Sequence, residues 1–214
     1  MSPSTLPWAQ WVFYVTCRWG WRALFAVRGG LTVTGLEYLP CRGPVILAPN
    51  HVSLLDPWIM CAASPNPLRS MAAEYLFKIP GLGPYLYGMG AFPVKQGVAD
   101  AEAVSKARRL LADGATLMVF PEGRCRPDGL PGPWLPGVAM LSLRSGAPVI
   151  PVVIRGSRQL LPLGSWWPRW SPLTVAFLPP VAAPAREGPV KVQVQSCLQR
   201  LQDAWLRGFR GLRD

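Results

Sequence analysis

Short apolar runs of strand length alternate with segments of helical pattern, and this alternation constrains the fold of the chain most strongly. The clearest apolar runs are residues 45–48, 116–120 and 149–154. The helical segments between them are residues 57–63, 99–111 and 137–144. Half of the 214 residues are hydrophobic, enough for one sizeable core. We therefore predict a single α/β domain with a mostly parallel or mixed central sheet flanked by helices.

Other segments extend the same pattern. Residues 31–36 alternate apolar and polar side chains, and residues 68–72 and 173–178 also have strand character. Residues 190–207 carry apolar side chains at helical spacing and predict a closing helix. We find no internal repeat, low-complexity segment or linker that would mark a domain boundary within this pattern.

The only histidine of the chain, His51, lies in the string PNHVSLLDP at residues 49–57. Imidazole, with a reference pKa of roughly 6.5, is the usual general base near neutral pH. Asp56 follows close enough to turn back onto the ring, and the string lies between a strand and a helix, where open α/β sheets place their ligand sites. The alternatives are a structural histidine and an aspartate that only caps the helix, with Pro57 in its first turn.

A second string, TLMVFPEGRCRPDG at residues 116–129, places two arginines in a glycine-containing loop after a predicted strand. Paired guanidinium groups suit bidentate capture of a phosphate. The alternative is a solvated, arginine-rich turn.

Together the two strings are more specific than either alone. The pattern NHxxxxDP followed by FPEG, basic residues and DG resembles the glycerolipid acyltransferases, in particular the 1-acylglycerol-3-phosphate acyltransferases. Residues 90–94 (GAFPV) and 147–154 (APVIPVVI) resemble two further blocks of that family, in the family's order. The resemblance covers roughly residues 30–180.

The resemblance implies a reaction and a set of roles. An acyl group would pass from an acyl thioester, acyl-CoA or acyl carrier protein, to a hydroxyl of a lysophospholipid. The default acceptor is 1-acylglycerol-3-phosphate and the product phosphatidic acid. His51 would be the general base, with Asp56 holding its ring. The expected substrate-binding residues are Lys95, Glu122, Gly123, Arg124 and Arg126.

Some positions depart from the family pattern. Gln96 and Cys125 stand where the family has arginine, and Leu135 stands where it commonly has lysine. Lysine at position 95 cannot copy a guanidinium fork. These differences leave another lysolipid or an amino-lipid open as the acceptor. We interpret Cys125 as a residue without a nucleophilic role.

The formal net charge of +11 points to anionic partners, although solubility alone is the simpler explanation. Anionic phospholipid headgroups attract basic residues, and the same field would attract acyl-CoA or an acidic carrier protein. We expect no nucleic acid partner, because no zinc-finger spacing or RNP string accompanies the charge. We expect no metal and no resident cofactor, because five dispersed cysteines and one histidine form no metal motif and no dinucleotide fingerprint is present.

Residues 8–28 predict a helix rich in tryptophan, with Arg18 and Arg22 on one face. Arg18 interrupts the apolar run short of the roughly 20 residues that span a bilayer. We therefore expect an amphipathic membrane-associated segment (residues 1–29) before an acyltransferase domain (residues 30–214). The protein would be peripheral or monotopic on the cytoplasmic face of the cell membrane, as dispersed cysteines suit a reducing compartment. The alternative is a core helix whose tryptophans pack on the sheet.

Two aromatic segments stay open. Residues 74–89 either line an acyl channel or pack the core, and we favour the core. The cluster WWPRW at residues 166–170 is either a second membrane contact or a loop that plugs the fold. Two rival functions are a serine hydrolase, for which no GxSxG motif is present, and a lipid-binding protein without catalysis.

Overall fold

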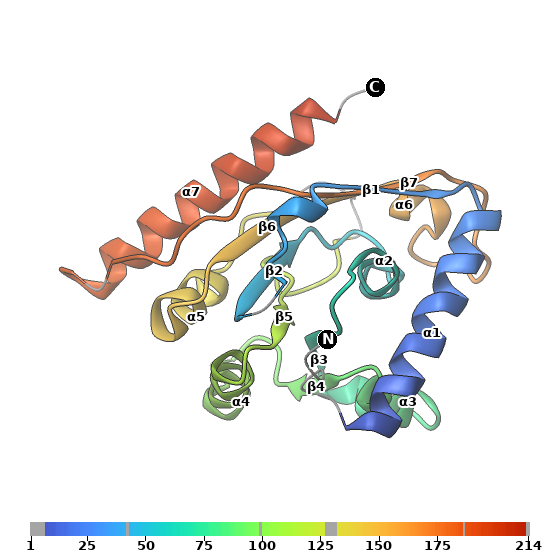
Figure 1. Cartoon of the computed structure of the whole chain (residues 1–214), viewed down its shortest axis with the longest axis horizontal. Helices are drawn as coiled ribbons and strands as arrows, with labels where there is room; N and C mark the ends of the chain where they lie inside the picture. The colour runs from blue at the N-terminus through green and yellow to red at the C-terminus, as the bar shows by residue number, and fades with distance from the viewer. Residues whose placement is uncertain (1–6, 42, 99, 127–131, 186, 213–214) are drawn as a thin grey trace.

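A computed structural model describes residues 7–41, 43–98, 100–126, 132–185 and 187–212 as one α/β unit (Figure 1). The strands are β1 (Leu31–Thr34), β2 (Val45–Pro49), β3 (Leu68–Ala73), β4 (Ala91–Val94), β5 (Thr116–Met118), β6 (Val149–Arg155) and β7 (Leu173–Phe177). The α-helices are α1 (Trp8–Val27), α2 (Asp56–Ala63), α3 (Leu82–Gly88), α4 (Ala101–Ala112), α5 (Gly137–Ser145), α6 (Ser157–Leu160) and α7 (Val190–Gly211). Two 3-10 turns are η1 (Leu36–Tyr38) and η2 (Glu74–Lys78).

The seven strands form one mixed sheet in the order β1-β7-β6-β2-β5-β3-β4. Strands β6, β2, β5, β3 and β4 are parallel, β7 runs antiparallel to β6, and β1 is parallel to β7. The predicted fold class is confirmed. The carboxyl ends of the five parallel strands meet at one edge of the sheet, which we call the carboxyl edge.

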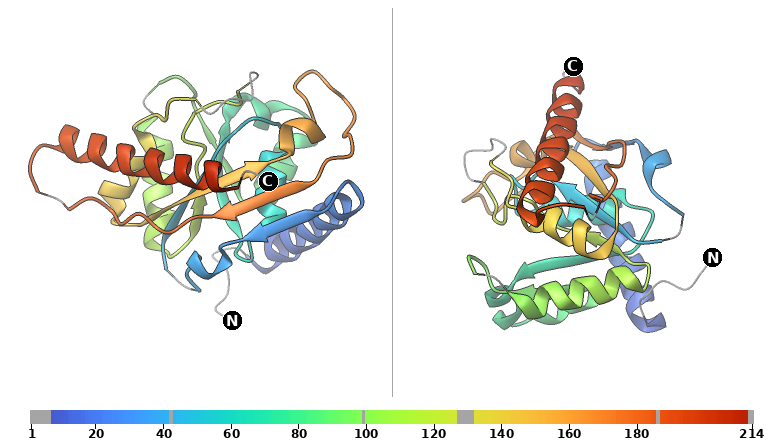
Figure 2. Two further views of the ribbon diagram at one scale, coloured as in Figure 1. Left: turned by 90° about the horizontal axis from the view of Figure 1, so that it is seen from above. Right: turned by 90° about the vertical axis from the view of Figure 1, so that its left-hand side faces the viewer.

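Helices cover both faces of the sheet, with α4, α5 and α7 on one side and α1, α2 and α3 on the other (Figures 1 and 2). Successive residues of the central strand β2 serve opposite cores. Ile46 packs with side chains of α4, α5 and α7, whereas Val45 and Leu47 pack with those of α2 and with Phe25 of α1. Because both faces of β2 are buried, its sequence is a continuous apolar run and does not alternate between apolar and polar residues.

Sequence patterns gave most of the strands but not β4. Pro93 lies inside β4, and a proline argues against a strand because it cannot donate a ladder hydrogen bond. Strand β4 is one of the two edge strands and pairs only with β3, so the missing donor can face outward. The predicted strand over residues 116–120 ends earlier, at Met118, although the Val119 N–H still donates to the Leu47 carbonyl at 2.9 Å.

Helix α1 forms as predicted, but its two arginines lie differently from our expectation. The Arg22 guanidinium donates to the Ala62 carbonyl of α2 at 3.1 Å, and the Arg18 Nε atom is buried. The exposed residues of α1 carry no charge and are Trp8, Ala9, Trp11, Val12, Phe13, Thr16, Trp19, Gly20, Ala23, Ala26 and Val27. Within the part of the chain that the structure describes, no helix is both long and apolar enough to cross a membrane.

Candidate active site

His51 lies at the carboxyl edge, in the segment that joins β2 to α2. Asn50 fixes this segment to the neighbouring strand β6. Its side-chain amide donates to the Ile154 carbonyl at 3.1 Å, and its side-chain oxygen accepts the Ile154 N–H at 2.8 Å. Asn50 is buried, and no local sequence pattern indicates a role for it. Only a long-range pairing of β2 with β6 could have indicated one.

The structure brings His51 and Asp56 together, with 3.0 Å between Nδ1 of the imidazole and Oδ2 of the carboxylate. The same oxygen accepts the backbone N–H groups of Val52 at 2.7 Å and Ser53 at 2.8 Å. The Asp56 side chain is fully buried, while that of His51 is 15% exposed. An Nδ1–H that donates to the carboxylate leaves the Nε2 lone pair free to accept a proton.

Asp56 is not the N-cap of α2. Leu55 occupies that position, and Asp56 is the first residue of the helix. Its carboxylate turns back onto the amides that precede the helix, so the segment from His51 to Asp56 closes on itself. This local closure is the physical reason for the spacing of five residues. The interpretation of Asp56 as a simple helix cap is wrong.

Glu122 lies directly beside His51. Its Oε1 accepts the His51 backbone N–H at 3.2 Å, whereas its buried Oε2 has no hydrogen-bond partner among the described residues. Burial raises the pKa of the Glu122 carboxyl from 4.5 to about 7, and the hydrogen bond from His51 only partly opposes this rise. A carboxyl group that is unpaired on one oxygen and titrates near neutral pH suits contact with a polar substrate group.

The arginine loop is attached to the histidine by its backbone. The Arg126 N–H donates to the His51 carbonyl at 2.8 Å. Gly123 has a φ of +71°, and a Cβ there would lie 2.6 Å from the side chain of Leu135, so glycine is required for this turn. Arg124 is exposed and Arg126 half-buried. The structure therefore brings Glu122 and the backbone of Arg126 against His51, and Arg124 lies on the exposed side of the same loop.

Lys95 lies one loop away from this group. It follows the edge strand β4, and its backbone N–H donates to Asp100 at 2.9 Å. The adjacent Gln96 amide donates to the Gly123 carbonyl at 3.2 Å, which brings the two loops together. Asp128 and Gly129 of the second motif lie outside the described residues.

Cys125 lies among the acidic groups of the site. Burial first, and then the charges of Asp56 and Glu122, raise the pKa of its thiol to about 12. A thiol in this state is protonated near neutral pH and is a poor nucleophile. This agrees with an interpretation of Cys125 as a residue without a nucleophilic role. No three His, Cys, Asp or Glu side chains of the described residues come together as a metal site.

An apolar cavity of about 260 Å³ opens beside the His51 ring. The Phe120 ring, which stacks on His51 at 4.0 Å between centroids, also lines it. The remaining lining residues are Tyr14, Leu54, Pro57, Trp58, Cys61, Leu68, Ser70, Met71, Ala72, Leu76, Leu82, Leu86, Met89, Ala91 and Met118. Four of them come from residues 74–89, so a core role alone does not account for that segment.

The cavity follows strand β3 from one edge of the sheet to the other. Ala72 lies near the carboxyl edge, whereas Leu68 begins β3 level with Thr116, the first residue of β5. Four residues of strand span roughly 13 Å. The Tyr14 hydroxyl accepts the Leu68 N–H at 3.1 Å and packs with Cys61. Tyr14 and Cys61 thus lie at the end of the cavity farthest from His51.

Comparisons with known proteins place the chain in a family. The model of the Acyltransferase family matches residues 30–155, more than half of the chain. This protein belongs to the acyltransferase family. The chain is 29% identical over 136 residues to the chloroplastic 1-acyl-sn-glycerol-3-phosphate acyltransferase BAT2 of Brassica napus. The aligned residues are 62% of this chain and 39% of that protein.

A bacterial relative, the 1-acyl-sn-glycerol-3-phosphate acyltransferase of Borreliella burgdorferi, is 29% identical to this chain over 126 residues, which are 58% of this chain and 50% of that protein. The chain thus matches only about two fifths to one half of these relatives. The crystal structure of the 1-acyl-sn-glycerophosphate acyltransferase PlsC from Thermotoga maritima has the same fold. Its TM-score is 0.76 at 24% identity, covering 94% of this chain and 80% of that one.

Proposed function

We propose that this acyltransferase moves a fatty acyl group from an acyl thioester to a hydroxyl of 1-acylglycerol-3-phosphate, giving phosphatidic acid. The observation that carries the proposal is the 3.0 Å contact between His51 and Asp56 beside an apolar cavity and an arginine loop. One site thus offers a base, a place for an acyl chain and cations for a phosphate. The names of the two relatives described above identify 1-acyl-sn-glycerol-3-phosphate as the acceptor on which those proteins act.

The reaction needs only these groups. Nε2 of His51 takes the proton of the acceptor hydroxyl as its oxygen attacks the thioester carbonyl. Asp56 holds Nδ1–H and stabilises the imidazolium. The attack forms the new C–O bond and a tetrahedral oxyanion. This intermediate collapses to the ester by breaking the C–S bond, and the imidazolium gives its proton to the departing thiolate. No nucleophile of the protein is required.

The acceptor is positioned by the loop after β5. Arg124 and Arg126 supply guanidinium groups for the phosphate, and Lys95 adds a point charge from the adjoining loop. The Oε2 atom of Glu122, which has no hydrogen-bond partner among the described residues, is available to a glycerol hydroxyl. Gly123 permits the turn that carries these side chains.

The acyl chain of the donor lies in the apolar cavity. C–C bonds of about 1.5 Å in a staggered chain advance roughly 1.3 Å each. A depth of roughly 13 Å therefore accommodates on the order of ten carbons before Tyr14 and Cys61 close the end. The thioester would come from acyl-CoA or from acyl carrier protein, and both carriers are anionic partners for a chain of net charge +11.

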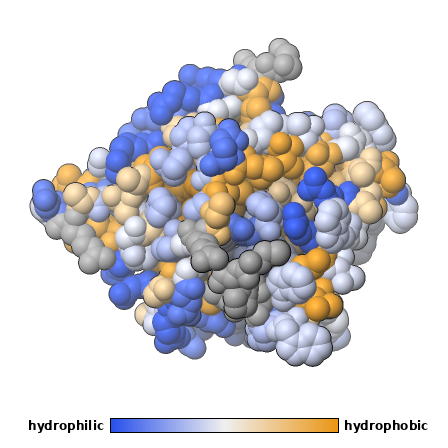
Figure 3. Space-filling model, in the orientation of Figure 1, coloured by the Kyte–Doolittle hydropathy of each residue, from blue (hydrophilic) through white to orange (hydrophobic). Residues whose placement is uncertain are grey.

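The exposed face of α1 supports a location at a membrane. Eleven exposed positions without a charge, among them Trp8 and Trp19, suit the interface between headgroups and acyl chains. On the face in Figure 3, hydrophilic residues gather over α7 and α4, whereas the side over α1 is mostly pale or orange. We propose that the enzyme works on the cytoplasmic face of the cell membrane.

An in vitro assay tests the proposal. Several lysolipids, with and without a phosphate, are offered with acyl-CoA and with acyl carrier protein. We expect transfer to 1-acylglycerol-3-phosphate, and an R126A variant should raise its KM more than it lowers kcat. Transfer only to phosphate-free acceptors would refute the role of the arginine loop.

A further inference from the structure

The loop between α6 and β7 exposes three tryptophans within five residues. Trp166 is 98% exposed, and Trp167 and Trp170 are each 71% exposed. An indole offers roughly 150–250 Å² of surface for burial, so this cluster approaches the largest apolar patches of ordinary monomers. The alternative in which the loop plugs the fold is excluded for these three side chains.

The loop holds the tryptophans in place. The Arg28 guanidinium lies 5.5 Å from the centre of the Trp167 ring and donates to the Pro168 carbonyl at 2.8 Å. The Arg169 N–H donates to the Leu160 carbonyl at 2.7 Å, and the Ser171 N–H donates to the Arg28 carbonyl at 2.8 Å. The indoles are therefore presented on an anchored backbone.

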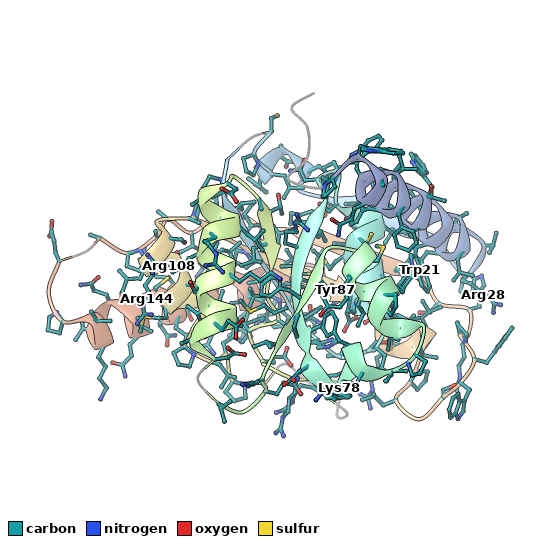
Figure 4. All side chains as sticks on the ribbon, turned by 90° about the horizontal axis from the view of Figure 1, so that it is seen from below. Trp21, Arg28, Lys78, Tyr87, Arg108 and Arg144 are labelled. Atoms are coloured by element: carbon teal, nitrogen blue, oxygen red, sulfur yellow. The ribbon has the colours of Figure 1, made fainter. Side chains whose placement is uncertain are left out.

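This loop stands beside the active site and at the end of α1. Ser53, two residues after His51, donates to the Leu161 carbonyl at 3.1 Å, so the loop begins at the carboxyl edge. Figure 4 shows Arg28 where the end of α1 meets the orange loop, and Figure 1 shows the same neighbourhood from another side. The loop that carries the exposed indoles thus lies between the end of α1 and the carboxyl edge.

The charged side chains of the loop and of the sequence segments that flank it have one sign. Residues 1–36 and 129–186 contain no aspartate or glutamate, so all 11 acidic residues lie elsewhere in the sequence. Arg158 and Arg169 are exposed on and beside the loop. Tryptophan combined with arginine, without acidic neighbours, is the composition of a surface that meets anionic headgroups. A protein partner would not need basic residues alone beside the indoles, together with an uncharged exposed face on the neighbouring helix α1.

We propose that Trp166, Trp167 and Trp170 insert among the headgroups of an anionic bilayer as a second membrane anchor, separate from α1. The two anchors together hold the carboxyl edge, and with it His51, at the lipid surface. The consequence for catalysis rests on the proposed function, because it matters for an acceptor that resides in the membrane.

The test uses the full chain and a W166A/W170A variant. Neither indole holds the loop, because the Arg28 contacts involve Trp167 and Pro168. The control is V190S/V192S, which removes exposed apolar side chains at the start of α7. Flotation with vesicles of equal parts phosphatidylglycerol and phosphatidylcholine measures partitioning. We expect a loss of roughly tenfold for W166A/W170A, little change for the control, and weaker binding of the parent protein to phosphatidylcholine alone.

Unchanged partitioning of a folded W166A/W170A protein would overturn the proposal. So would a parent protein that sediments as a dimer while W166A/W170A sediments as a monomer with unaltered vesicle binding, since the loop would then bind a second copy. Acyl transfer should fall in W166A/W170A for acceptors presented in vesicles but not for short-chain acceptors in solution. Absence of transfer in the parent protein would refute the proposed function, and flotation would still decide the anchor.

Discussion

Replacing Glu122 by glutamine should change how stability depends on pH. Burial raises the pKa of this carboxyl from 4.5 to about 7. The folded protein therefore keeps a proton that the unfolded chain releases as the pH rises through this interval. The stability that this proton contributes is complete below about pH 4.5 and is lost by about pH 7. Glutamine is a neutral isostere that keeps an oxygen for the His51 N–H.

The size of the effect follows from the shift. One pKa unit corresponds to about 1.4 kcal/mol, so the full shift is worth on the order of 3 kcal/mol. Allowing for relaxation around a charge placed in this site, we expect about 2 kcal/mol. E122Q should be close to the parent protein in stability near pH 4.5 and more stable by that amount above pH 7.5.

Urea unfolding of both proteins between pH 4.5 and 9 measures this difference, and subtraction cancels the groups that titrate in both. The matched control is E37Q, which changes an exposed glutamate and should shift stability by less than about 0.5 kcal/mol at any pH. Parallel curves for E122Q and the parent protein, or a less stable E122Q at pH 8.5, would refute the reasoning.

Three further outcomes follow from the site. D56N should lower kcat by about 10³-fold with little change in KM, because the imidazole loses the carboxylate that holds its tautomer. Steady-state kinetics measures both constants, and a much smaller loss of kcat at saturating acceptor would contradict this role of Asp56. C61F should shorten the cavity, so that long acyl donors lose kcat/KM relative to short ones, at a cost in stability of roughly 1–3 kcal/mol; a loss equal for all chain lengths would argue against the position of Cys61 at the far end. C125S should retain transfer activity in a donor-consumption assay, because the thiol takes no covalent part, and an inactive but folded C125S protein would contradict that.

Much of the fold was predictable because its determinants are local. The apolar run of β2, the proline in the first turn of α2 and the turn at Gly123 each impose their structure on neighbouring residues. The same holds for the pair His51 and Asp56, whose contact closes within six residues. Strand β4 was not predicted because Pro93 argues against a strand. Proline is tolerated in an edge strand, and the sequence alone does not reveal that β4 lies at an edge.

The cavity could not be predicted, since it depends on contacts between distant segments. Tyr14 reaches the amide of Leu68 from a helix 54 positions earlier, and no pattern in either segment indicates that contact. The sequence likewise did not indicate which side of α1 packs against the rest of the domain. Trp21 stacks on Trp58 of α2 while Trp19 faces outward, and apolar residues on all sides of a helix do not tell which side packs.

The most direct test of the central claim is single-turnover acyl transfer by H51A, measured together with its binding of 1-acylglycerol-3-phosphate. If His51 is the general base, transfer should fall by about 10³-fold or more while acceptor affinity stays within about twofold, because the arginine loop that holds the phosphate remains. Transfer at a rate close to that of the parent protein would contradict the claim.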